Sequence, residues 1–157
     1  MVKTKGIKVR EADTGDLKAL MQMGEAMHKE STFRTLPYDY EQLGRTLLYV
    51  LNHETGVMLV AESDGDVIGG LGVVAHPAYS SKALIASDVA FYIKPEFRGS
   101  MAAIRLLQSA IQWAESMNVR RLTMANSAGA DSDTFDRLMI KKGFKVAGSV
   151  CYMDFGG

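Results

Sequence analysis

The stretch from Ala83 to Ala125 constrains the fold most, because it has the pattern of a strand, a helix and a second strand in succession. The apolar run 83–93 predicts a largely buried central strand, which Pro95 ends. Apolar residues then recur at helical spacing from Ala103 to Met117, as in a helix packed on a sheet. The run 119–125 predicts the second strand. Strands joined by such a crossover lie parallel, so part of the sheet must be parallel.

The rest of the chain predicts shorter elements that are mainly antiparallel. Asp64-Gly65 between two β runs is a strong hairpin signal. The other expected elements are strands at 7–10, 57–61 and 67–75, helices from Leu17 to near Ser31, from Asp39 to about Leu51 and from Phe135 to Gly143, and a final strand from Phe144 to Phe155. We therefore expect one domain over residues 1–157, of the α/β (α+β) class, with a mixed, mostly antiparallel central sheet flanked by helices.

Composition excludes several classes of protein. Eighteen Lys+Arg balance eighteen Asp+Glu, so the basic excess that is typical of nucleic-acid binding is missing. One cysteine, Cys151, excludes an intrachain disulfide and a Cys-rich zinc site, and three His without paired spacing predict no metal site. No secretory signal precedes the first strand, and no apolar run approaches the roughly 18 residues of a membrane span. We expect a cytoplasmic protein without a nucleic-acid or membrane partner, and Cys151 as a core residue.

The loop between the long strand and the long helix is a candidate anion site. A helix begins with unpaired N–H groups and the positive end of its dipole, which favours phosphates. The small residues Gly99, Ser100, Ala102 and Ala103 would let a ligand approach that backbone, and Arg98 adds a positive charge. A tight strand-to-helix turn with a surface Arg explains the same residues.

The segment Ile93-x-Pro95-Glu96-Phe97-Arg98-Gly99, followed by a helix, resembles the acetyl-CoA signature of the GNAT superfamily of N-acetyltransferases. That signature is Arg/Gln-x-x-Gly-x-Gly/Ala. Arg98 fits its first position and Ala103 its last, whereas Met101 stands where the family usually has its first Gly. The resemblance extends over nearly the whole chain and includes the Gly143-Phe144 junction after the last helix.

This resemblance implies acetyl-CoA as cofactor and a site for it. Two adjacent parallel strands, 83–93 and 119–125, would splay apart, and the pantetheine arm would lie in the gap. The cofactor-binding residues implied are Phe91, Tyr92 and Ile93 beside the thioester, Arg98, Gly99, Ser100, Met101, Ala102 and Ala103 at the pyrophosphate, and Asn126 at the pantetheine amide.

The catalytic residues that the resemblance implies are a base and an acid. Asp88 is the only acidic residue of its strand and is the candidate base, although a structural role at a strand end explains it too. Glu30, at the end of the first helix, is a weaker candidate in a region that walls the acceptor site of the family. Met139 occupies the position of the usual Tyr acid, so Tyr152, Tyr92 or water would have to donate the proton, with Tyr152 the expected donor.

We therefore expect an acetyl-CoA-dependent N-acetyltransferase that acts on an amine of a small molecule or peptide by direct transfer. Two alternatives stay open. One is a degenerate member that binds CoA or regulates without acetyl transfer, and the other is an interaction protein that uses the fold alone. Family members often pair through edge strands, so a homodimer is a further expectation.

Overall fold

The computed structural model describes residues 6–126 and 132–156 of the chain. Its five strands form one sheet in the order β1-β2-β3-β4-β5. The strands are β1 (Lys8–Glu11), β2 (Gly56–Ser63), β3 (Asp66–Pro77), β4 (Leu84–Ile93) and β5 (Arg121–Thr123). Neighbours are antiparallel except for β4 and β5, which are parallel. The mixed, mostly antiparallel sheet predicted from the sequence is therefore confirmed.

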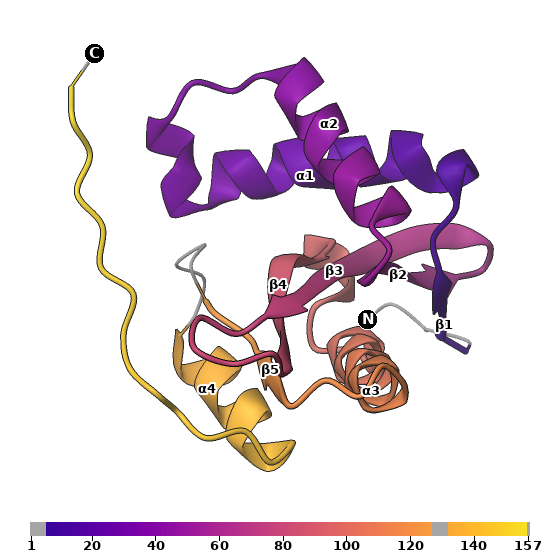
Figure 1. The fold of residues 1–157 in the computed structure, drawn as a ribbon. Coiled ribbons are helices and arrows are strands. Elements are labelled where there is room, and N and C mark those ends of the chain that lie inside the picture. The colour runs from indigo at the N-terminus through magenta and orange to yellow at the C-terminus, as the bar shows by residue number, and fades with distance from the viewer. Residues whose placement is uncertain (1–5, 127–131, 157) are drawn as a thin grey trace.

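Helices cover both faces of this sheet (Figure 1). The helices α1 (Leu17–Glu30) and α2 (Tyr40–Asn52) lie together on one face, and α3 (Ala102–Ser116) lies on the other. The helix α4 (Ser132–Lys141) follows β5, and single 3₁₀ turns occupy Thr14–Asp16, Thr32–Thr35 and Pro95–Phe97. None of these helices is long and apolar enough to cross a bilayer, as far as residues 6–126 and 132–156 show.

The two apolar layers follow from alternation along the strands, because successive side chains point to opposite faces. Leu59 of β2 and Leu71 of β3 are buried in the layer under α3. Met58 and Val60, the neighbours of Leu59, are buried in the layer under α1 and α2. Each face of β2 thus supports a different helical layer.

The predicted hairpin between β2 and β3 is confirmed. Asp64 and Gly65 both have positive φ, 50° and 81°, as a two-residue turn between twisted strands requires. The carbonyl and side-chain geometry of Asp tolerates this region, and Gly enters it without cost.

A bulge in β4 changes which side chains face α3. Asp88 pairs with Val73 and Ala90 pairs with Gly72, so Val89 is an extra residue in the ladder. Ala86 lies in the α3 layer before the bulge, whereas the odd-numbered Phe91 and Ile93 lie in it afterwards. The bulge thus shifts the alternation of β4 by one residue just before its end.

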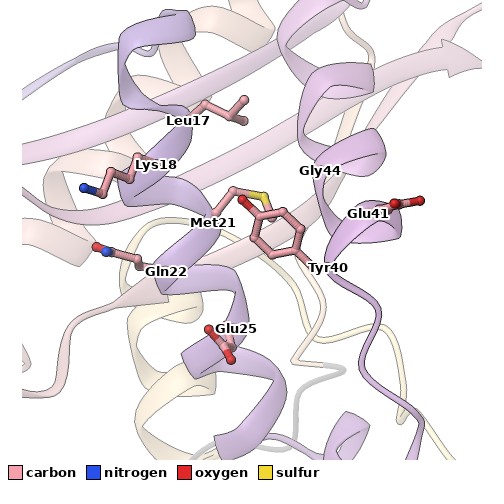
Figure 2. A pocket seen from close by; sticks show the side chains of 8 residues that line it. All are labelled: Leu17, Lys18, Met21, Gln22, Glu25, Tyr40, Glu41 and Gly44. Carbon is pink, nitrogen blue, oxygen red and sulfur yellow. The ribbon is translucent and has the colours of Figure 1, made fainter.

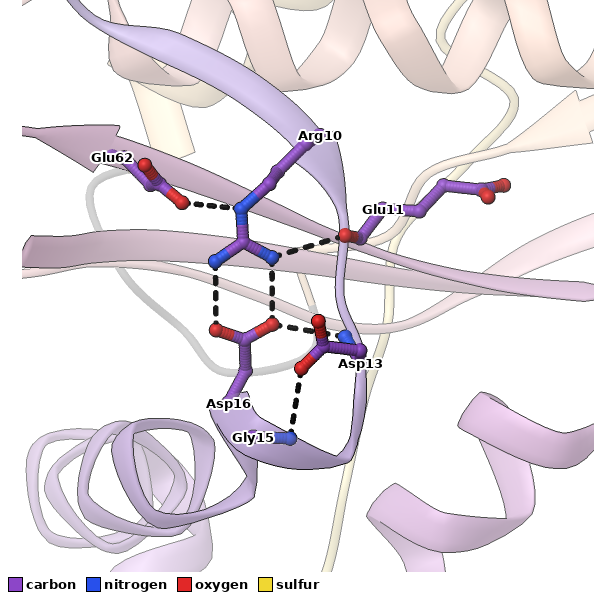
Figure 3. Close-up of polar contacts among 6 residues, drawn as sticks. All are labelled: Arg10, Glu11, Asp13, Gly15, Asp16 and Glu62. Carbon is purple, nitrogen blue, oxygen red and sulfur yellow. Dashed lines mark hydrogen bonds and ion pairs between the residues drawn. The ribbon is translucent and has the colours of Figure 1, made fainter. Parts of the chain in front are cut away.

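A polar network joins β1, β2 and the start of α1 (Figure 3). The guanidinium of Arg10 donates to both carboxylate oxygens of Asp16 at 2.7 and 2.8 Å, and also binds Glu62. Asp16 is nearly buried and accepts from the backbone N–H of Asp13 at 2.9 Å. The Arg10 guanidinium holds the pKa of Asp16 below its ordinary range.

The prediction of a final strand from Phe144 to Phe155 is wrong. Residues 144–156 have no regular secondary structure and lead away from the body of the molecule (Figure 1). Alternating apolar residues make a strand only where the backbone pairs with a neighbour, and β5, at the sheet edge, is only three residues long. Cys151, expected in the core, is exposed.

Candidate functional site

The strands β4 and β5 diverge halfway along β4. They pair only at Ile85, Ala86 and Ser87, which face Arg121, Leu122 and Thr123. From Asp88 to Ile93, β4 continues without a neighbour on that side, within the part of the chain that the structure describes. The strands are therefore splayed as predicted, and they leave an unpaired stretch of β4 backbone.

Asp88 lies where the two strands diverge. Its Oδ1 accepts a hydrogen bond from the backbone N–H of Ala125 at 3.0 Å, so the carboxyl bridges the opening. Burial raises the pKa of Asp88, and the Ala125 hydrogen bond offsets only part of this effect. Asn126 follows Ala125 directly and is half-buried. The structure thus brings together two of the residues predicted for the site.

The turn between β4 and α3 exposes backbone donors. Gly99 has a φ of 84°, which favours glycine, and a Cβ added there would meet only open space. The Oγ of Ser100 accepts from the N–H of Ala102 at 3.2 Å. The N–H groups of Met101, Ala103 and Ile104 have no acceptor among the described residues. Three donors at a helix start fit a phosphate group.

Met101, the departure from the family signature, is half exposed, at 50%. It precedes α3, and its side chain makes no capping hydrogen bond. Ala102 is fully buried under the sheet, so the small residue there serves packing.

Arg98 is held by groups of the protein itself. Its Nε donates to the carbonyl of Ile93 at 3.0 Å, and its Nη2 donates to Oε2 of Glu30 at 2.7 Å. The guanidinium carbon lies 5.3 Å from the centre of the Tyr92 ring. The Tyr92 hydroxyl donates to the other oxygen of Glu30 at 2.9 Å.

These contacts set the charges of the cluster. The Arg98 guanidinium lowers the pKa of Glu30, which therefore stays ionised. Burial and the neighbouring Glu30 carboxylate raise the pKa of Tyr92 to about 12, so its hydroxyl stays protonated. A carboxylate with a lowered pKa is a poor base, which counts against the base role considered for Glu30.

Sequence reasoning missed this cluster because Glu30 lies 62 and 68 positions from its partners. One signal was present. Glu30 is the last residue of α1, where the helix dipole disfavours a carboxylate unless a cation compensates it.

The remaining predicted residues separate into two groups. Phe91 and Ile93 pack in the α3 layer while Tyr92 lies on the α1 side, and all three belong to the unpaired stretch of β4.

Tyr152 is 66% exposed in the segment 144–156, without a hydrogen bond or ring contact in the described part. The structure does not bring Tyr152 to Asp88, because the strand expected to carry it is not formed. Met139 is buried in α4.

A hollow lies away from this site, between α1 and α2 (Figure 2). It has a volume of about 510 Å³, and Leu17, Met21 and Tyr40 give it apolar walls with Glu25 and Glu41 at its rim. None of the residues predicted for the site lines it. Among the described residues, no group of His, Cys, Asp or Glu side chains is arranged to hold a metal ion.

The family model of the acetyltransferase (GNAT) family matches residues 20–134. The chain belongs to this family. The match contains most of α1, the hairpin, the splayed strands and the turn before α3. No curated protein matches the GNAT chain at a significant level.

Solved structures agree in fold. A transcriptional regulator from Bacillus halodurans C-125 superimposes with a TM-score of 0.77 at 19% identity, over 96% of this chain and 100% of that one. A predicted acetyltransferase with acetyl-CoA from Clostridium acetobutylicum gives 0.71 at 17% identity, over 95% and 96%. AAC(6')-Iy, in complex with the bisubstrate analogue CoA-S-monomethyl-acetylneamine, gives 0.74 at 14% identity, over 98% and 100%. Similarity at these identities shows the GNAT fold.

Proposed function

We propose that this GNAT protein is an N-acetyltransferase that uses acetyl-CoA and acts on an amine of a small molecule or peptide. The observation that carries the proposal is the unpaired stretch of β4, which leads to the turn before α3 and has the Asp88 carboxyl at its other end, where β4 and β5 diverge. Two structural neighbours support it, since one contains acetyl-CoA and another a CoA–acetylneamine analogue.

The residues present fit the cofactor. The free N–H groups of Met101, Ala103 and Ile104, with the charge of Arg98, would hold the pyrophosphate. The backbone from Asp88 to Ile93 would pair with the pantetheine arm, and Asn126 would bind one of its amides. When bound, acetyl-CoA supplies an activated acetyl group as a thioester.

The chain itself would supply positioning and proton transfer. In the net reaction the amine nitrogen bonds to the acetyl carbon, the carbon–sulfur bond breaks, and the thiolate leaves. Asp88 would take the proton that the ammonium must lose, and a backbone N–H of Phe91–Ile93 would stabilise the negative oxygen of the transition state. The thiolate would take its proton from water, since Tyr152 lies in the exposed C-terminal segment and Met139 cannot donate.

One observation favours a second candidate, a CoA-binding module without transfer. No hydroxyl occupies the Met139 position, and Tyr152 is exposed. A thermal-shift titration with acetyl-CoA, followed by thiol release with a panel of amines, separates the candidates. Stabilisation with thiol release for one amine supports the enzyme, and stabilisation without release supports the module. Absence of stabilisation would contradict both.

The acceptor, a cytoplasmic location and a homodimer through edge strands remain predictions. AAC(6')-Iy is a reason to place aminoglycoside-like amines first in the panel, followed by peptides with a free α-amine.

A further inference from the structure

The Glu30 carboxylate connects three parts of the molecule. It stands at the end of α1 and binds Tyr92 on β4 and Arg98 in the turn before α3. Its two oxygens are used separately, one for each partner. A carboxylate at the C-terminal end of a helix is disfavoured by the dipole, so Arg98 is what stabilises it there.

Arg98 keeps donors for another anion. A guanidinium has five N–H groups. Glu30 and the Ile93 carbonyl engage Nη2 and Nε, whereas Nη1 has no acceptor among the described residues. The free N–H groups at the start of α3 begin three positions further along the chain. One guanidinium can therefore bind Glu30 and a phosphate at the same time.

We propose that Glu30 is a positioning residue that couples phosphate binding at residues 98–104 to the order of the C-terminal end of α1. This inference rests on the proposed function, because CoA is the phosphate ligand concerned.

The coupling is possible because the Glu30–Arg98 ion pair is weak on its own, so a bound phosphate can strengthen it. Glu30 and Arg98 are 42% and 49% exposed, and such pairs contribute little because water screens them and both side chains must be ordered. A phosphate on Nη1 would already fix the Arg98 side chain, so pairing with Glu30 would then cost less entropy. A cofactor over the pair would also exclude water and strengthen the attraction.

The effect would extend beyond Glu30 into the loop that follows α1. The Nε2 of His28, in the last turn of α1, lies 3.0 Å from the carbonyl of Leu36, and the His28 ring packs edge-on against Tyr38 with centres 5.4 Å apart. Phe33, Leu36 and Tyr38 are between 38% and 49% exposed. Ordering the end of α1 would thus order an apolar surface suited to contact an acceptor.

Hydrogen exchange with and without saturating CoA tests the proposal. In the wild type, CoA should slow exchange several-fold both at residues 99–105 and at residues 28–36, where the amides of Ser31 and Leu36 are hydrogen-bonded. In Glu30→Gln, protection at 99–105 should persist and protection at 28–36 should be lost. Thermal melting checks that the variant is folded.

Glu25→Gln is the matched control. Glu25 lies on the same helix, is 43% exposed and pairs with Lys29 at 3.2 Å, away from Arg98. Its variant removes the same charge and should keep both regions of protection.

The outcomes distinguish the two proposals. If CoA protects 99–105 in the wild type but not 28–36, or if Glu30→Gln behaves like Glu25→Gln, the role of Glu30 is wrong and CoA binding stands. If CoA protects neither region, the proposed function fails and this inference fails with it.

Discussion

At the scale of single residues, Asp88 and Asp16 are two carboxyls with opposite environments. Burial raises the pKa of Asp88, whereas Arg10 lowers the pKa of Asp16. One is thus favoured in its neutral form and the other in its charged form. Their expected effects on activity and stability differ accordingly.

Asp88→Asn should lower kcat by about 10²–10⁴-fold and leave acetyl-CoA affinity unchanged, as for loss of a general base. A base must be deprotonated, so wild-type kcat/KM should fall as pH drops through a pKa above the ordinary Asp range. Steady-state kinetics across pH, with calorimetry for acetyl-CoA, measure both effects. A near-normal rate of the Asp88→Asn variant at neutral pH would show that the role of Asp88 is structural.

The same variant should not unfold the protein. A raised folded pKa gives a stabilising contribution at acid pH that is lost as pH rises through that pKa, so ionised Asp88 is destabilising at neutral pH. Asn keeps an oxygen that can accept from Ala125. A melting temperature equal to or above that of the wild type is expected, which separates lost chemistry from lost structure.

Asp16→Asn should destabilise the fold by about 1–3 kcal/mol at pH 7, because the partly exposed Arg10 would lose the charge-assisted hydrogen bonds to its nearly buried partner. A lowered folded pKa gives stability above the unfolded pKa that is lost as pH falls through the folded one. The difference from wild type in urea unfolding should therefore shrink below pH of about 4. Glu62→Gln, at the more exposed Glu62, should cost less. An equal difference at all pH values would contradict this account.

Sequence reasoning singled out a residue where that residue was exceptional in its own element. Asp88 stood out as the only acid of an apolar strand, and the structure places it at the opening between β4 and β5. The Glu30–Arg98 pair had no comparable local signal, because tertiary packing alone brings its members together. The placement of Tyr152 failed because it depended on a strand that did not form.

At the scale of elements, a side chain that caps the start of α3 should stabilise the helix and compete with acetyl-CoA for the same backbone N–H groups. Met101→Asp would place a capping carboxylate beside the free N–H groups of Ala103 and Ile104. We expect unchanged or higher stability, by up to about 1 kcal/mol, and acetyl-CoA binding weakened more than tenfold by competition and repulsion. Calorimetry and thermal melting measure the two effects.

Met101→Asn provides the neutral comparison, since it can cap without adding charge. It should weaken binding less than Asp does. If the wild type and the Asp variant bind acetyl-CoA with equal affinity, the pyrophosphate does not bind at this turn.

Elements with a clear periodicity of apolar residues were predicted correctly, because this periodicity directly reflects which side chains are buried. The long helix with the apolar stripe is α3, whose buried residues pack on the sheet, and the helix expected from Asp39 is α2, which Asp39 caps. β5 is only three residues long, against a predicted 119–125, because pairing with β4 stops where the strands diverge. An apolar pattern cannot show where a neighbouring strand turns away.

At the scale of the whole molecule, the segment after Phe144 adds exposed apolar surface rather than core. Val150, Tyr152 and Phe155 are between 60% and 87% exposed. Deleting residues 146–157 should therefore leave the unfolding free energy of the monomer nearly unchanged, within about 0.5 kcal/mol.

Urea unfolding and light scattering of both forms at several concentrations check this prediction. A large loss of stability, or a dimer that becomes a monomer on truncation, would show that this segment packs against the body or a second copy in solution.

The extra residue in β4 has a consequence for how this chain can vary. Val89 is 42% exposed, so many side chains fit there, but pairing Val89 regularly with β3, without the bulge, would turn Phe91 and Ile93 toward α1 and Tyr92 toward α3. Tyr92 would then lose Glu30, and the layer beneath α3 would lose two apolar side chains. A single residue inserted between Asp88 and Ile93 would also reverse these side chains and should be damaging, whereas deletion of Val89 removes the bulge, keeps the pairs of β4 with β3 and should be tolerated better.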